Sequence, residues 1–234
     1  MPDLRLRSNL PELMDGDDVA LDDFAACMVD LATVNTLTLA RGPTLAFVAR
    51  AVRHSSDRLT ILDVGFGAGD MLRSIARMLR SKGLRARLIG IDLNPRSAPA
   101  ARSMTPDDLA IEWLTGDAYA LSGDDTPDIV ISSLVTHHMA DAEIVRFLTW
   151  MEATARRGWF VNDLHRHALA WYGFMAMAKL AGWHRFVQHD GPLSVARSFR
   201  RPDWERLLAQ AAMPAAATIR WRFPFRYCVE RARW

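Results

Sequence analysis

From Leu59 onward, apolar segments alternate with segments of helical periodicity, and this alternation constrains the fold more than any other feature. Four segments are nearly continuous in apolar residues, as strands buried on both faces are: LTILDV, ARLIGIDL, PDIVISSL and GWFVNDL. Between them lie helical patterns such as GDMLRSIARMLRSKG, which Gly83 ends, and DAEIVRFLTWMEATARRG. Strands joined through helices favour a parallel sheet with helices on both faces. The sequence therefore predicts an α/β fold.

The two ends of the chain depart from this alternation. Residues 1–53 are predicted to be helical, because LDDFAACMVDLATVNTLTL places apolar side chains three to four positions apart. Further helices are predicted near residues 165–182 and 202–212. After them, AATIRW and FRYCVER are strand-like and are joined by so few residues that only an antiparallel hairpin is possible. We expect an N-terminal helical lid over residues 1–53 and a ligand-binding domain over residues 54–234.

A glycine-rich turn follows the first apolar strand. The segment ILDVGFGAGD places Gly65, Gly67 and Gly69 at every second position, and the next helix begins near Asp70. Glycines let the main chain approach a ligand closely, and a helix N-terminus offers free N–H groups. The spacing differs from the dinucleotide fingerprint G-x-G-x-x-G, and no Walker Gly-Lys-Ser/Thr follows. We expect a nucleotide-like ligand at this turn.

Two aspartates follow the next two strands. Asp92 ends the second strand, where a carboxylate can accept protons from both ribose hydroxyls. Asp117, in the GDA segment, is placed to meet the exocyclic amino group of adenine. Each aspartate could instead cap a helix, and the glycines could reflect close packing alone. Their combined order and spacing favour a ligand that contains a nucleoside.

These motifs together resemble those of the class I S-adenosylmethionine-dependent methyltransferases. LDVGFGAGD is similar to their first motif, GIDL to the ribose-binding end of strand two, GDA to the adenine-contacting turn, and PDIVISSLVTHHMAD to strand four and its loop. The resemblance covers roughly residues 57–164. It implies a Rossmann-like sheet of seven strands, the last one antiparallel, and S-adenosylmethionine as cofactor. The cofactor-binding residues that it implies are Asp63, Gly65, Gly67, Gly69, Asp92, Leu93, Asp117, Ala118 and Ser133.

Other stretches resemble a narrower group within that class. SSLVTHHM is similar to enzymes that methylate quinones, phenols and polyketides, and PELMD, VNDLHR and GPLSVARSF to bacterial methyltransferases of polyketide pathways. This resemblance implies O-methylation of a small aromatic or polyketide-derived acceptor, as in secondary metabolism. C-methylation of a quinone-like ring and cofactor binding without turnover are the alternatives. DNA methylation is disfavoured, because Ser132-Ser133-Leu134 replaces the Asn/Asp-Pro-Pro-Tyr motif.

Two adjacent histidines are the candidate catalytic residues. His137 and His138 follow the fourth strand, at the carboxyl edge where ligands bind in open α/β sheets. A sulfonium is already a strong electrophile, so the protein has to align the acceptor and remove its proton, which an imidazole can do near neutral pH. We favour His138 over His137 as the base. The structural alternative is an ion pair between one histidine and Asp141.

No metal is expected. Catechol-type enzymes hold a divalent cation with acids after strand four and an Asp-Asn pair after strand five. Here serines end the fourth strand, and the later pair is Asn162-Asp163, in reversed order. His165 and His167, which follow that pair, do not have the spacing of a metal site.

The expected acceptor contacts lie outside the cofactor-binding core. Trp171 and Met175 belong to an apolar helix that is rich in aromatic and thioether side chains, and Met14 belongs to the lid. Ordinary core packing is the alternative for the helix residues. Asn35 and Arg41 are candidates for the lid or for the cofactor carboxylate.

Composition limits the partners and the compartment. The formal net charge is +2 with acids and bases mixed, so nucleic acid is not expected as a partner. Two cysteines, Cys27 and Cys228, are too few for a disulfide framework and fit a reducing cytoplasm. The N-terminus lacks a signal-peptide core, and ALAWYGFMAMA is too short to span a bilayer. We expect a cytoplasmic monomer or homodimer without stable membrane insertion.

Overall fold

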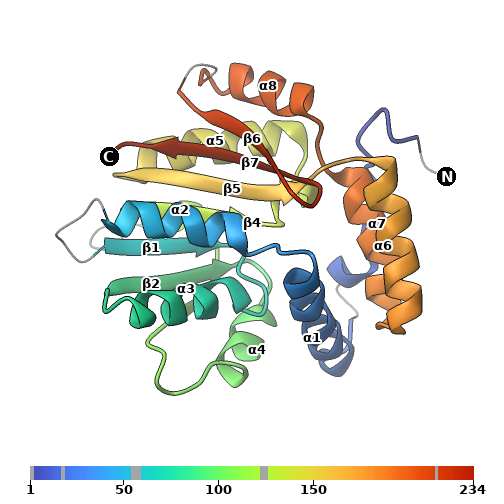
Figure 1. Cartoon of the computed structure of the whole chain (residues 1–234), viewed down its shortest axis with the longest axis horizontal. Helices are drawn as coiled ribbons and strands as arrows, with labels where there is room; N and C mark the ends of the chain where they lie inside the picture. Colours follow the sequence, from blue (N-terminus) through green and yellow to red (C-terminus); the bar gives the residue numbers. More distant parts are fainter. Residues whose placement is uncertain (1–2, 17–18, 54–58, 122–125, 214–215) are drawn as a thin grey trace.

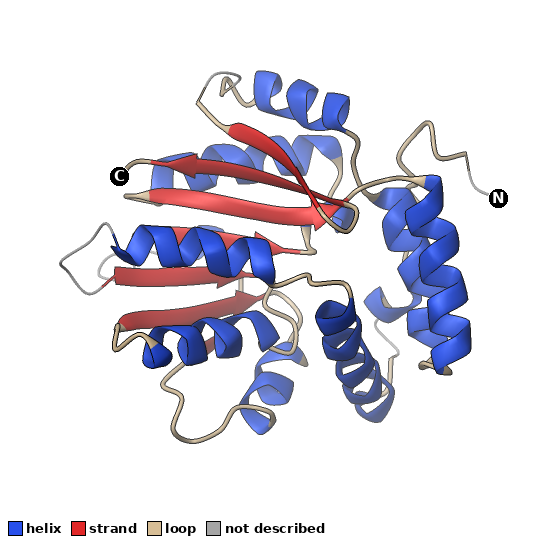
Figure 2. Cartoon of the chain, viewed as in Figure 1, coloured by secondary structure: helices blue, strands red, loops and turns tan. Residues whose placement is uncertain are grey.

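A seven-stranded sheet runs through the molecule, with helices on both faces (Figures 1 and 2). The computed structural model describes residues 3–16, 19–53, 59–121, 126–213 and 216–234. The strand order is β3-β2-β1-β4-β5-β7-β6, in which β1 to β5 are parallel and β7 is antiparallel to both of its neighbours. The strands are β1 (Leu59–Val64), β2 (Ala86–Asp92), β3 (Glu112–Thr115), β4 (Ile129–Ser133), β5 (Gly158–Leu164), β6 (Thr218–Arg222) and β7 (Arg226–Ala232). The predicted α/β class and the reversed last strand are confirmed.

Alternate side chains of the central strands point into two separate apolar layers. In β4, Ile129 and Ile131 pack with α2, α3 and α4, whereas Val130 packs with α5 and α8 on the opposite face. This period of two is why a strand covered on both faces is apolar at nearly every position. The helices are α1 (Leu21–Leu37), α2 (Gly42–Arg53), α3 (Asp70–Ser81), α4 (Ser97–Ser103), α5 (Asp141–Thr154), α6 (Ala168–Ala181), α7 (Arg185–Arg197) and α8 (Arg201–Gln210).

A third apolar cluster lies beyond the carboxyl ends of the parallel strands, where α1, α6 and α7 gather at the right of Figure 1. The 3-10 helix η1 (Leu13–Asp15) packs against α7. α2 belongs instead to the sheet, because Phe47 stacks on Phe160 with ring centroids 4.8 Å apart. The N-terminal 53 residues therefore contribute both to the sheet cover and to the wall at the strand ends. The boundary expected after residue 53 adjoins residues 54–58, which lie outside the described part.

α7 is a helix that the sequence analysis did not predict, because Gly191-Pro192 is a strong helix-breaking signal. A tertiary contact explains why this segment contains a glycine. A Cβ atom on Gly191 would lie 1.9 Å from the ring of Phe174 on α6, so only glycine lets the two helices pack this closely. This contact also sets which face of α6 is turned toward the strand ends.

Within the described residues, no single helix has the length and apolarity that a bilayer span requires. The pair formed by Asp23–Leu37 and α2 satisfies both criteria, with a bend of 75° between its halves.

Candidate active site

The glycine turn after β1 combines packing constraints with one open position. Gly65, Gly67 and Gly69 all have positive φ. A Cβ atom on Gly65 would lie 2.4 Å from Val135, and one on Gly69 would lie 2.3 Å from the ring of Trp113. Gly65 and Gly67 both line the main cavity, but Gly67 differs, because its Cβ would meet only the Met28 sulfur at 3.8 Å. Close packing therefore explains two of the glycines, and Gly67 leaves the backbone open to a ligand.

Asp92 holds this turn in place. Its Oδ2 accepts the Gly67 N–H at 2.8 Å, and its Oδ1 accepts the Asn94 N–H at 2.8 Å. Burial raises the pKa of Asp92, and these hydrogen bonds partly oppose that shift. The Ser97 side chain also donates a hydrogen bond to Asp92, and a carboxylate with about four lone-pair sites can accept more than these three. Asp92 can therefore support the turn and still accept hydrogen bonds from a ligand.

Asp63 and Asp70 lie at the same strand ends. Burial first, and then the charges of Asp70 and Asp92, hold the pKa of Asp63 well above its ordinary value. Asp70 accepts hydrogen bonds from Arg41 at 3.0 Å and from Asn35 at 3.2 Å. Clustered carboxylates repel one another, and a positively charged ligand would relieve that repulsion. The edge of the sheet around the glycine turn therefore favours a cationic group.

The remaining residues expected to bind a cofactor fall into different settings. Ser133 lines the main cavity, with its hydroxyl 3.3 Å from that of Thr44. Asp117 accepts the Tyr119 N–H at 2.9 Å and so caps the 3-10 helix η2 (Ala118–Ala120). Ala118 is buried and Leu93 is exposed. The helix-cap alternative considered for Asp117 is thus observed, which leaves one of its oxygens for other contacts.

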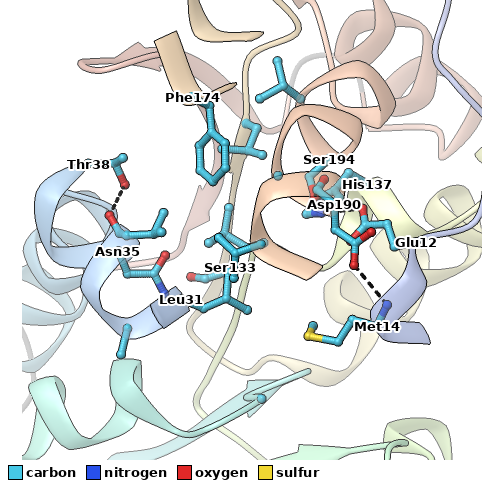
Figure 3. A pocket seen from close by; sticks show the side chains of 18 of the residues that line it. Glu12, Met14, Leu31, Asn35, Thr38, Ser133, His137, Phe174, Asp190 and Ser194 are labelled. Atoms are coloured by element: carbon cyan, nitrogen blue, oxygen red, sulfur yellow. Dashed lines mark hydrogen bonds and ion pairs between the residues drawn. The ribbon is translucent and has the colours of Figure 1, made fainter. Parts of the chain in front are cut away.

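The main cavity has a volume of about 380 Å³ and lies between the strand ends and helices α1, α6 and α7 (Figure 3). Its walls are mostly apolar, with Leu31 on α1 and Phe174 on α6 as examples. Met14 lines it as expected, whereas Trp171 and Met175 lie on a different face of α6 from the lining residues. The apolar helix was therefore identified from the sequence, but the lining face is that of Phe174 and Met177.

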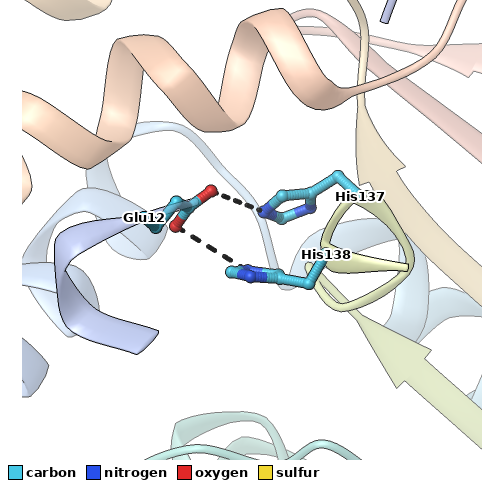
Figure 4. Close-up of side chains that lie close together, drawn as sticks. All are labelled: Glu12, His137 and His138. Atoms are coloured by element: carbon cyan, nitrogen blue, oxygen red, sulfur yellow. Dashed lines mark ion pairs between the residues drawn. The ribbon is translucent and has the colours of Figure 1, made fainter. Parts of the chain in front are cut away.

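Glu12, His137 and His138 meet at one wall of the cavity, as Figure 4 shows. The histidines lie on the 3-10 helix η4 (Thr136–His138), directly after β4. Glu12 Oε1 is 3.9 Å from His137 Nε2, and Glu12 Oε2 is 3.8 Å from His138 Nε2. Glu12 is buried and accepts a hydrogen bond from the Ser194 hydroxyl at 2.9 Å. Two imidazoles and one carboxylate therefore converge on the same point.

Asp163 fixes the orientation of His137. Its carboxylate lies 2.8 Å from His137 Nδ1 and also accepts hydrogen bonds from the His137 N–H and the Thr136 hydroxyl. Burial alone would raise the pKa of Asp163, but the charge of His137 and these hydrogen bonds outweigh it and lower the pKa to about 2. An ionised Asp163 holds the proton on Nδ1 and directs Nε2 toward Glu12.

The alternative pairing of a histidine with Asp141 is not observed among the described residues. Asp141 pairs instead with Arg7 at 2.6 Å and with Arg206 at 2.7 Å. His165 and His167 do not line the cavity. His165 Nδ1 accepts the Trp221 indole N–H, and His167 Nδ1 accepts the Leu169 N–H and caps α6.

Arg197 ties the N-terminal segment to the histidines. Its guanidinium donates to the carbonyl oxygens of His137, His138 and Leu10. The sequence analysis did not select Arg197, Glu12 or Ser194 as site residues. One sequence signal could have pointed to these residues. The stretches that resemble small-molecule and polyketide-pathway methyltransferases are PELMD, VNDLHR, GPLSVARSF and SSLVTHHM, and the fold brings all four together.

Comparisons with known proteins show what the chain is similar to. The sequence model of a family described as "Methyltransferase domain" matches residues 61–158. A ubiquinone biosynthesis O-methyltransferase of Bartonella quintana is 30% identical over 117 residues, which are 49% of this chain and 45% of that protein. A 2-methyl-6-phytyl-1,4-hydroquinone methyltransferase of Synechocystis sp. is 28% identical over 161 residues, which are 68% of this chain and 42% of that protein. The chain thus spans less than half the length of either relative.

A solved structure extends the similarity to the whole fold. The crystal structure of an S-adenosylmethionine-dependent methyltransferase from Aquifex aeolicus superposes with a TM-score of 0.60 at 15% identity, covering 93% of this chain and 100% of that one. Residues 61–158 are thus similar to a methyltransferase domain, and the fold as a whole is similar to that of the Aquifex aeolicus enzyme. The family match includes the glycine turn, Asp92 and both histidines. Glu12, Asp163 and Ser194 lie outside it, so the distinctive part of the site comes from segments that the family model does not cover.

Proposed function

We propose that the chain transfers the methyl group of S-adenosylmethionine to a hydroxyl group of a small, largely apolar aromatic acceptor. One observation carries this proposal: the Glu12–His137–His138 cluster and Gly67 of the glycine turn line the same cavity. Proton removal and cofactor binding would then occur within reach of one another. The volume of about 380 Å³ is within the range of small-molecule sites.

The residues at the glycine turn fit the cofactor chemically. Bound S-adenosylmethionine would supply a methyl group activated by its sulfonium. The carboxyl groups of Asp63 and Asp70 favour the positive charges of the cofactor, and Asp92 has acceptor capacity left for ribose hydroxyls. Gly67 offers a backbone without a side chain at the point of approach.

The acceptor oxygen is proposed to bind between Glu12 and the histidines. Separations of 3.8 and 3.9 Å are too long for direct hydrogen bonds. They suit an intervening oxygen atom that makes hydrogen bonds of about 2.8 Å to two of these groups. His137 is buried and hydrogen-bonded to Asp163, whereas the side chain of His138 is 29% exposed. His138 is therefore proposed to accept the proton at Nε2, and His137 to position the oxygen.

The same groups also suit a transition metal, because their donor atoms all lie within 4.8 Å of one another. Tetrahedral zinc at about 2.0–2.1 Å from each ligand would bring neighbouring donors to about 3.4 Å, closer than those found. The sequence prediction of a metal-independent reaction therefore stands as a proposal. Dialysis against EDTA should leave turnover unchanged. A loss that zinc or magnesium restores would assign the cluster to a metal instead.

Carbon methylation of a hydroquinone-like ring is the second candidate, since one relative is named as a hydroquinone methyltransferase. The deciding experiment incubates the protein with methyl-labelled S-adenosylmethionine and a panel of phenols and hydroquinones, and locates the label by mass spectrometry. Label on oxygen supports the proposal, and label on carbon favours the second candidate. If no acceptor is methylated although the cofactor binds, a binding protein without turnover is the better description.

A further inference from the structure

Arg226, at the start of β7, is a buried cation whose hydrogen bonding is incomplete. Its side chain is almost fully buried. Nη2 donates to the Thr38 hydroxyl at 3.1 Å, whereas Nε and Nη1 are buried without a hydrogen-bond partner among the described residues. An unpaired buried donor is costly, and more so when it carries charge. Because this burial is costly, we look for a function of the side chain that offsets the cost.

Arg226 is among the residues that line the main cavity, at a distance from the glycine turn. Arg226 pairs with Leu164 across the β5–β7 ladder, which places it at the ligand-binding edge of the sheet. β4 and β5 separate β7 from β1, so the two strands are about 14 Å apart across the sheet. Arg226 therefore belongs to the acceptor end of the cavity rather than to the cofactor end.

The neighbouring carboxylates do not neutralise Arg226 by hydrogen bonding. Asp163 lies close enough to interact electrostatically, but its oxygens accept hydrogen bonds from Thr136, His137 and Leu164. Burial lowers the pKa of Arg226 to about 10, with the Asp163 charge opposing the shift. The side chain is therefore cationic at neutral pH.

The other charged groups in the cavity wall have partners. Asp190 accepts the N–H groups of Leu13 and Met14, Asp70 accepts from Arg41, and Glu12 accepts from Ser194. Arg226 stands out among the described lining residues, because two of its three guanidinium nitrogens have no partner.

We propose that Arg226 binds a carboxylate of the methyl acceptor, so that the acceptor is an aromatic hydroxy acid rather than a neutral phenol. A guanidinium recognises a carboxylate through charge-assisted hydrogen bonds. His137 and Arg226 both interact with Asp163, which places the hydroxyl and carboxylate subsites within the span of one small molecule. This inference rests on the proposed function, because it assigns the acceptor of the same site.

The test compares three probes by calorimetric titration: 2,4-dihydroxybenzoate, its methyl ester and resorcinol. They share the phenolic ring, and only the first carries a negative charge. We expect the acid to bind the unmodified protein at least tenfold more tightly than either neutral probe. Equal affinity of the three would overturn the proposal, and this comparison requires no variant to fold.

Two variants test whether Arg226 is the residue that binds the carboxylate. Arg226→Gln should abolish the preference for the acid, and Arg220→Gln, on the exposed part of β6, should preserve it. A preference that persists in Arg226→Gln would overturn the assignment. So would loss of S-adenosylhomocysteine binding in Arg226→Gln without loss of acid binding, because Arg226 would then contact the cofactor. If S-adenosylhomocysteine fails to bind even the unmodified protein, the proposed function fails, while the three-probe comparison still decides the carboxylate subsite.

Discussion

At the scale of single residues, the proposed mechanism assigns different roles to two adjacent histidines. Asp163 restrains His137, and His138 faces Glu12 with its ring partly open to the cavity. His138→Asn should lower kcat by roughly 10²–10⁴-fold, the usual contribution of a general base, with little change in cofactor Kd. His167→Asn, outside the cavity lining, is the matched control. Steady-state kinetics on both variants would test the division, and a normal kcat in His138→Asn would refute it.

If Asp63 lies beside the bound cofactor as proposed, cofactor binding should depend on pH. Burial and the charges of Asp70 and Asp92 raise the pKa of Asp63 and so disfavour its ionised form. A cation bound beside it favours the ionised form, so binding should release a proton and strengthen as pH rises. Calorimetry in two buffers with different ionisation enthalpies measures that release. Asp63→Asn should remove it, and buffer-independent heats in the unmodified protein would contradict this account.

At the scale of elements, the contact between α6 and α7 shapes the cavity. Gly191→Ala places a methyl group against Phe174 and should destabilise the protein by about 1–3 kcal/mol, as overpacking does. Gly173→Ala is the control on α6, because its Cβ would meet nothing within 4 Å and alanine favours a helix by about 0.5–1 kcal/mol. Urea unfolding compares the two. Equal destabilisation would show that α6 and α7 do not depend on this contact.

Local pattern and tertiary contact explain which elements could be predicted. β1 and β5 have the bounds that their apolar runs predicted, because continuous burial leaves a local signature. The lining face of α6 could not be predicted in this way, since a contact with α7 decides it and α7 itself contains Gly191-Pro192. The sequence showed that α6 is apolar, and only the fold shows that Phe174 rather than Met175 faces the cavity.

At the scale of the whole molecule, acid should weaken the fold in a defined window. Burial first, with the charges of His167 and two arginines, lowers the pKa of His165 to about 4 from an ordinary value of 6.5. The unfolded chain therefore takes up a proton first, so stability falls as pH drops from about 6.5 through about 4. His165→Gln should flatten this part of the profile in urea unfolding. An unchanged slope would assign the acid sensitivity to other groups.

The site residues that directly follow a strand could be predicted from the sequence. The residues that meet only because distant segments fold together could not. The glycine turn, Asp92 and the two histidines each follow a strand, so their approximate position comes from local pattern alone. Glu12 and Arg226 come from opposite ends of the chain, and neither has a local signature of function. Their roles depend on distances that only the folded chain defines.

The Arg197 bridge between Leu10 and the two histidine carbonyls attaches the N-terminal segment to the part of the cavity wall that carries the proposed base. The central sheet and the glycine turn lie outside that segment. Removing the residues before residue 13 should therefore separate cofactor binding from methyl transfer. The shortened protein should still bind the cofactor, but it should no longer transfer the methyl group to an acceptor.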